Sequence, residues 1–118
     1  MKQATSNLFL IRPFRFFGNP ETSVNNYFQS NDFNAEQLSI SKQALIEFDN
    51  FLNILRKNNL NVILFNDTEK PITPDSIFPN NWISTHESGD IFIHSMFAEN
   101  RRQERRADIV NFLKEKFS

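Results

Sequence analysis

Two short apolar runs, "LFLI" at 8–11 and "VILF" at 62–65, flank a segment with helical periodicity, and this arrangement most constrains the fold. Pro13 stops the first run, which predicts a buried strand there. The unbroken apolar character of the second run predicts a strand that is buried on both faces. The first half of the chain is therefore expected to follow the order β, α, β.

The intervening helix is expected between Asn34 and the basic end "RKNN" at 56–59. Asn34 precedes Gln37 by three residues, as in a capping box, and basic side chains suit a helix C-terminus. Residues 12–34 read as a loop with Gly18 among several turn formers. The apolar stripe of the helix is expected to comprise Ala44, Leu45, Phe48, Phe51, Leu52 and Leu55.

The second half begins with 66–81, which has no regular pattern, and a loop of this length tends to be functional or mobile. Short strands are expected at 82–86 and 91–94, joined by "ESGD", in which Gly89 can supply the positive φ of a tight turn. Asn100 and Gln103 repeat the capping-box signal. A final amphipathic helix is predicted from the spacing of Ile109, Val110, Leu113 and Phe117.

The expected fold class is α/β, with the order β-α-β-β-β-α. If the repeating unit is ββαβ, residues 1–66 lack an opening strand and residues 67–118 lack a closing one. Nothing downstream covers the apolar stripe of the last helix. These observations predict a single partial domain, either the N-terminal part of a longer protein or a chain that needs a partner.

Composition restricts the function. The formal net charge of −1 argues against general attraction to nucleic acid or to anionic membranes. The absence of cysteine excludes disulfides, thiolate metal sites and a cysteine nucleophile within these 118 residues. The N-terminal apolar run is too short for a signal peptide or a spanning helix, so a cytoplasmic protein without membrane association is expected.

The stretch "DTEKPITPDSIFPNNW" at 67–82 is the first candidate site. Its three prolines fix φ and stiffen the loop, which can therefore hold Asp75, Asn80 and Asn81 at fixed orientations. A carboxylate binds a guanidinium through two parallel hydrogen bonds, whereas an amide also suits a neutral ureido group. The alternative is that these side chains form turn and cap bonds to nearby backbone.

The basic run "ENRRQERR" at 99–106 is the second candidate site. At a helix start, Arg101, Glu104 and Arg105 would share one face, and a forked guanidinium could clamp a substrate carboxylate. The alternative is a solvated, self-paired helix face. A nucleic-acid patch is disfavoured, because acidic residues dilute the positive charge and no binding module surrounds the run.

His86 and His94 lie on or beside neighbouring expected strands. They could pair as metal ligands, but no third ligand stands at metal spacing, which favours structural histidines. No metal and no cofactor is therefore expected.

Three stretches, "RPFRFFGNPETSVNNYFQ", "EFDNFLNILRKNNLNVILFNDTEKPITPDSIFPNNWISTH" and "SMFAENRRQERR", closely resemble the amidinotransferase-like branch of the guanidine-modifying superfamily. This branch includes arginine-deiminase-related proteins and citrulline-utilising hydrolases. The resemblance implies an α/β-propeller, the pentein fold, built from ββαβ units, of which this chain covers the N-terminal part. It also implies a C-terminal cysteine that forms a covalent intermediate and a histidine acid/base from a later unit, both outside this chain.

The resemblance assigns substrate-binding roles to few residues. Asp75 matches a Pro-Asp motif, and Asn81 stands where arginine-deiminase relatives carry the aspartate of Phe-x-x-Asp. An amide there favours a neutral ureido group, as in citrulline, over a cationic guanidinium. Arg101 corresponds to the arginine that binds the substrate α-carboxylate, and Glu104 is its expected orienting partner.

The expected function is therefore that of a hydrolase acting on C–N bonds of a citrulline-like or arginine-like amino acid, with the isolated chain inactive. An amidinotransferase is the first alternative, because an amine instead of water could resolve the intermediate. The second alternative is a non-catalytic pentein piece that forms a homo-oligomer through its uncovered helix and strand edges. The expected partner is a small amino acid, and not nucleic acid.

Overall fold

A computed structural model of the chain describes residues 5–14 and 35–117, and the expected mixed α/β class is present. The elements are β1 (Asn7–Arg12), α1 (Ala35–Lys57), β2 (Asn61–Asn66), the 3-10 helix η1 (Pro79–Asn81), β3 (Ile83–Thr85), β4 (Ile91–Ile93), α2 (Glu99–Arg102) and α3 (Ala107–Phe117).

The strands expected at the two apolar runs are present as β1 and β2, which pair in parallel from Asn7↔Asn61 to Arg12↔Asn66. At the start of the pair, the Asn61 side-chain amide donates a hydrogen bond to the Asn7 amide oxygen at 2.9 Å. At its end, the backbone N–H of Asp67 donates to the carbonyl of Arg12, also at 2.9 Å. Because parallel strands end at the same edge, the loop that follows β2 begins beside the end of β1.

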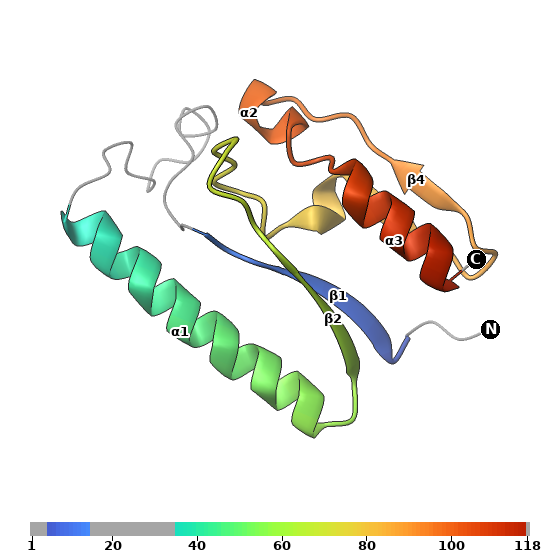
Figure 1. Cartoon of the computed structure of the whole chain (residues 1–118), viewed down its shortest axis with the longest axis horizontal. Coiled ribbons are helices and arrows are strands. Elements are labelled where there is room, and N and C mark those ends of the chain that lie inside the picture. Colours follow the sequence, from blue (N-terminus) through green and yellow to red (C-terminus); the bar gives the residue numbers. More distant parts are fainter. Residues whose placement is uncertain (1–4, 15–34, 118) are drawn as a thin grey trace.

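The expectation that 62–65 is buried on both faces is wrong. Val62 is buried, but Ile63, Leu64 and Phe65 are only half-buried. The reason is the narrowness of the sheet, since β1 and β2 pair only with each other among the described residues. Figure 1 shows α1 along one side of this pair and α3 on the other.

Helix α1 ends at Lys57, as the basic residues there predict. Asn59 follows with a φ of 65°, a left-handed conformation that asparagine tolerates after a helix. Arg56 donates from Nη2 to the carbonyl of Val62 at 3.1 Å and so connects the helix end to β2. The capping box at Asn34 lies outside the described residues. Within the expected apolar stripe, Leu52 is buried, whereas Phe51 is 52% exposed, so the prediction for Phe51 is wrong.

Strands β3 and β4 form the expected antiparallel hairpin, with Ser84 opposite Phe92. Gly89 has a φ of 95°, as the turn required, and the turn is closed by a hydrogen bond from the His86 N–H to the Asp90 carbonyl. The strands are shorter than predicted. Trp82 ends η1, and the two histidines lie just beyond the strand ends.

The core lies between β1, the hairpin and α3. It is built from Ile11, Trp82, Ile83, Met96, Ile109 and Leu113. Ile109 and Leu113 are thus covered by residues that precede them, so the expectation of an uncovered stripe on the last helix is wrong for these two side chains. Phe117 of the same stripe is exposed. No helix in the described ranges is long and apolar enough to cross a membrane.

The final helical region differs from its prediction. A short α2 and the longer α3 replace one helix beginning at Asn100, and the N-cap of α2 is Ala98, which makes no side-chain cap bond. The capping-box interpretation of Asn100 and Gln103 is therefore wrong. The chain turns between the two helices, where the N–H of Arg106 donates to the carbonyl of Glu104 at 2.8 Å.

Candidate substrate-binding site

The loop after β2 is folded against itself. The Thr73 hydroxyl donates to Asp67 Oδ1 at 3.2 Å, and the Ser76 hydroxyl donates to the Thr73 carbonyl at 2.8 Å. Thr73 and Ser76 are both buried. The loop is thus held by internal hydrogen bonds as well as by its prolines, and it presents Asp75 from a fixed backbone.

Arg101 and Glu104 form the centre of the site. Arg101 donates from Nε to Glu104 Oε2 at 3.0 Å and from Nη2 to Oε1 at 3.1 Å, a bidentate pair. The Glu104 side chain is fully buried, and that of Arg101 is 15% exposed. Such a planar, two-bond arrangement fixes the orientation of the guanidinium. Because Glu104 engages Nε and Nη2, the Nη1 group of Arg101 stays available to an acceptor other than Glu104.

The Arg101 guanidinium also joins α2 to the loop. Its Nε lies 3.8 Å from Asp75 Oδ2, and the Asp75 side chain is 13% exposed. Nη2 makes long contacts of 3.5 Å to the carbonyls of Asp75 and Phe78. The structure therefore brings together Asp75, Arg101 and Glu104, three of the five residues that the sequence pointed to.

Asn80 and Asn81 lie in η1, the 3-10 turn that directly continues this loop. Both are exposed, and within the described ranges neither amide side chain takes part in a hydrogen bond. The backbone N–H of Asn81 donates to the Phe78 carbonyl, which Arg101 Nη2 also contacts. Asn81 is thus adjacent to the cluster through its backbone. Turn or cap bonds by the two amides, the structural alternative, are not observed among these residues.

Arg105 does not join the cluster. Helix α2 ends at Arg102, so residues 101, 104 and 105 do not share one helix face, and the Arg101–Glu104 pair forms across the turn after the helix. Arg105 is exposed and donates to the Arg102 carbonyl at 3.2 Å. The shared-face prediction is therefore wrong for Arg105, although the pairing of Arg101 with Glu104 is observed.

Sequence reasoning missed two kinds of supporting contact. Arg106 donates from Nη1 to the Asn66 carbonyl at 2.9 Å and so holds the start of α3 against the end of β2. The second is the pair of buried hydroxyls at Thr73 and Ser76. The bond from Ser76 to the Thr73 carbonyl, three residues back, is a local pattern that the sequence contained. The Arg106 contact spans 40 residues and had no local signal.

Burial dominates the electrostatics of the site. It raises the pKa of Glu104 above the ordinary 4.5, although the hydrogen bond and charge of Arg101 act in the opposite direction. The negative charges of Asp75 and Asp67 raise this pKa further. Two carboxylates, those of Glu104 and Asp75, thus lie near the Arg101 guanidinium, and the charge of Asp67 also acts on Glu104. Because ionised carboxylates only accept hydrogen bonds, the site favours a ligand group that is rich in N–H donors.

The raised pKa of Glu104 predicts a pH dependence of stability. Above pH 4.5 the unfolded chain loses this proton while the folded protein keeps it, so the contribution of Glu104 to the free energy of unfolding falls as pH rises through that window. Glu104→Gln has no such proton. We expect the free energy of unfolding of the variant, relative to the natural protein, to increase from pH 4.5 upward, measured by urea denaturation. A constant difference would contradict the raised pKa.

A separate hollow of about 740 Å³ lies on another part of the molecule, between the start of β1, the hairpin turn and α3. Its lining includes Phe9, Asp90, Ile91 and Leu113, but none of the five candidate site residues.

A family model described as N,N dimethylarginine dimethylhydrolase, eukaryotic, matches residues 12–118. The chain belongs to this family. The dimethylarginine dimethylhydrolase family is a hydrolase family within the guanidine-modifying, pentein superfamily, so the superfamily predicted from the sequence is confirmed. No curated protein and no solved structure matches the chain significantly. The match covers the whole loop, η1 and α2, and thus every residue of the candidate site.

Proposed function

We propose that this chain supplies one part of the substrate site of a hydrolase that cleaves a C–N bond of a guanidino or ureido amino acid. The observation that carries the proposal is Arg101, which is held bidentately by the buried Glu104 against the loop bearing Asp75. Membership of a hydrolase family whose name refers to a methylated arginine supports it.

The geometry supports the following roles. Arg101 binds the substrate α-carboxylate through Nη1, the group that Glu104 leaves free, and Glu104 positions the guanidinium. Asp75 and the exposed amides of Asn80 and Asn81 bind the planar end of the substrate, which presents N–H donors in both guanidino and ureido form. These contacts position the substrate, while the bond-breaking groups come from elsewhere.

The chain contains no cysteine, so we propose that the nucleophilic thiolate, and the histidine that serves as acid and base, belong to residues outside these 118. The thiolate attacks the central carbon of the substrate and expels an amine, and water then releases the product. We favour a citrulline-like substrate, because Asn81 offers an amide instead of a carboxylate to the planar group. The propeller built from ββαβ units is part of the same proposal.

The test uses the reading frame extended beyond codon 118, expressed as a whole protein, with citrulline, arginine and N,N-dimethylarginine offered separately. Hydrolysis of citrulline gives ornithine, ammonia and carbon dioxide, whereas hydrolysis of dimethylarginine gives citrulline and dimethylamine. We expect ornithine from citrulline. Dimethylamine would instead assign the substrate that the family name states. Product formed only when an amine acceptor is added would identify an amidinotransferase, and no turnover of any substrate would overturn the proposal.

Asn81→Ala in that whole protein is expected to lower kcat/KM by about 100-fold, because it removes a polar group that positions the reacting part of the substrate. Its free energy of unfolding should change by less than about 0.5 kcal/mol, since the side chain is exposed. Asn53→Ala, an exposed asparagine on α1, is the matched control and should change neither quantity. Unchanged turnover of the Asn81 variant would remove Asn81 from the substrate site.

The non-catalytic alternative has one supporting observation, which is a set of exposed apolar side chains on α1. The set comprises Leu38, Ile40, Ile46, Phe51 and Ile54. Exposed apolar surface of this kind is typical of an interface. Sedimentation of the chain as it stands would distinguish the alternatives, because a stable, well-defined homo-oligomer without turnover in the extended protein favours the structural role.

A further inference from the structure

Two histidines and a serine converge on the β3–β4 hairpin, on the segment that the proposed function does not use. His94 Nε2 lies 3.0 Å from the Ser84 hydroxyl oxygen, and His86 Nε2 lies 3.2 Å from the same oxygen. Ser84 belongs to β3, while each histidine follows the end of one strand of the hairpin. The two imidazoles therefore direct the same kind of nitrogen toward one point.

The hairpin holds this arrangement in place. The backbone N–H of His86 donates to the Asp90 carbonyl at 3.0 Å, and that of His94 donates to the Trp82 carbonyl at 2.7 Å. The ring of His86 packs edge-on against Phe92, with 4.7 Å between ring centroids. Backbone pairing thus fixes the spacing of the two residues, and the aromatic contact restricts one ring. All three side chains remain within reach of solvent.

Hydrogen bonding to Ser84 satisfies both rings only when the two imidazoles are opposite tautomers. The Ser84 hydroxyl has a single O–H, so it can donate to only one of the two Nε2 atoms. The other imidazole must then carry its proton on Nε2. It donates that proton to Ser84 Oγ, so the two rings are paired as different tautomers. A bound cation instead accepts a lone pair from both nitrogens, and each ring then keeps its proton on Nδ1.

We propose that His86 and His94 bind a divalent transition-metal ion through their Nε2 atoms. Imidazole suits Zn²⁺, Ni²⁺ and Cu²⁺, and copper is expected to bind most tightly of the three. Such an ion lies about 2.0–2.1 Å from each nitrogen.

The remaining coordination positions belong to water, with the Ser84 hydroxyl nearby. Among the described residues there is no group of three or more histidine, cysteine, aspartate or glutamate side chains that could hold a metal ion. The site is therefore an open, two-histidine surface site that exchanges its ion with solvent, and not a closed structural centre. It is independent of the Asp75–Arg101–Glu104 cluster.

The test titrates the untagged chain with Cu²⁺ alone, then with Zn²⁺ alone, by calorimetry, and records the electron spin resonance spectrum of the copper form. We expect one ion per chain and nitrogen hyperfine structure from two imidazoles. His86→Ala and His94→Ala should each weaken binding by about tenfold or more. The double variant should show only background binding.

Glu87→Gln is the matched control, because it removes a charge beside His86 but no imidazole. It should bind copper as the natural chain does, and circular dichroism of every variant should show an unchanged fold. The proposal is overturned if either single histidine variant keeps the full affinity, or if Glu87→Gln loses the ion, since acidic residues of the turn would then be the ligands. It is also overturned if the natural chain binds no more than the double variant.

Discussion

Arg101→Leu is expected to lower the free energy of unfolding by about 3–5 kcal/mol, because it leaves the carboxylate of Glu104 buried without its cation. Glu104 is fully buried and receives two hydrogen bonds from Arg101. The loss therefore comes mostly from the unpaired charge and less from the missing side-chain volume. Urea denaturation, with circular dichroism as the signal, measures the change directly.

Two further variants separate this cause from others. Arg105→Leu removes an equal charge from an exposed position four residues away, and it should change stability by less than about 0.5 kcal/mol. The double variant Arg101→Leu with Glu104→Met replaces both charges by apolar groups of similar volume. It should regain most of the lost stability, because buried ion pairs gain little over well-packed apolar substitutes. A double variant as unstable as the single one would contradict this account.

Several local sequence signals predicted the local structures correctly. The hairpin follows from Gly89, whose φ of 95° few other residues adopt readily, and the end of α1 follows from its basic last turn. The strands 8–11 and 62–65 were also found within a residue of their expected ends. In each case the residues that decide the structure lie within a few positions of one another.

The failures arose where distant residues decide the structure. Helix α2 stops at Arg102 although the capping pattern predicted continuation, because Glu104 turns inward to Arg101 and Arg106 reaches back to Asn66. The burial of β2 was overestimated because an apolar run does not show how many strands its sheet contains. Helical periodicity likewise placed Phe51 in a stripe that the neighbouring elements do not cover.

The candidate site was predictable to the extent that its chemistry is local. Arg101 and Glu104 are three residues apart, and Asp75 stands out in a proline-rich loop, so each could be singled out in isolation. The loop and α2 contact each other through Arg101 and Asp75, which are 26 residues apart in the sequence. A contact at this separation cannot be read from local residue spacing. The loop and α2 meet because β1 and β2 end at the same edge of the sheet, where the loop begins. Arg106 holds the start of α3 at this edge through its hydrogen bond to the Asn66 carbonyl.

Trp82→Ala is expected to cost about 3–5 kcal/mol in the free energy of unfolding, because it opens a cavity in the centre of the core. Trp82 is completely buried and packs among Ile11, Ile83 and Ile109. Its backbone also connects η1 to the hairpin, since the backbone N–H of Trp82 donates to the Pro79 carbonyl and its carbonyl accepts from the N–H of His94. Urea denaturation measures this loss.

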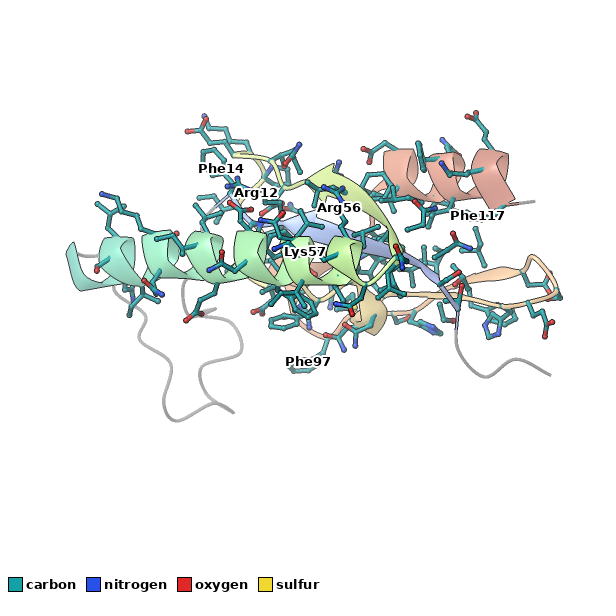
Figure 2. The ribbon with its side chains drawn as sticks, turned by 90° about the horizontal axis from the view of Figure 1, so that it is seen from below. Arg12, Phe14, Arg56, Lys57, Phe97 and Phe117 are labelled. Atoms are coloured by element: carbon teal, nitrogen blue, oxygen red, sulfur yellow. The ribbon has the colours of Figure 1, made fainter. Side chains whose placement is uncertain are left out.

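Phe97→Ala is the matched control. Phe97 is 86% exposed and projects away from the ribbon in Figure 2, so its truncation should change stability by less than about 0.5 kcal/mol. Trp82→Phe adds a finer test, because no acceptor among the described residues pairs with the buried indole N–H, and an unpaired buried donor costs about 1–3 kcal/mol. Phenylalanine removes that donor while keeping most of the ring. It should therefore be much less destabilising than alanine, and equal losses would show that the N–H has a partner.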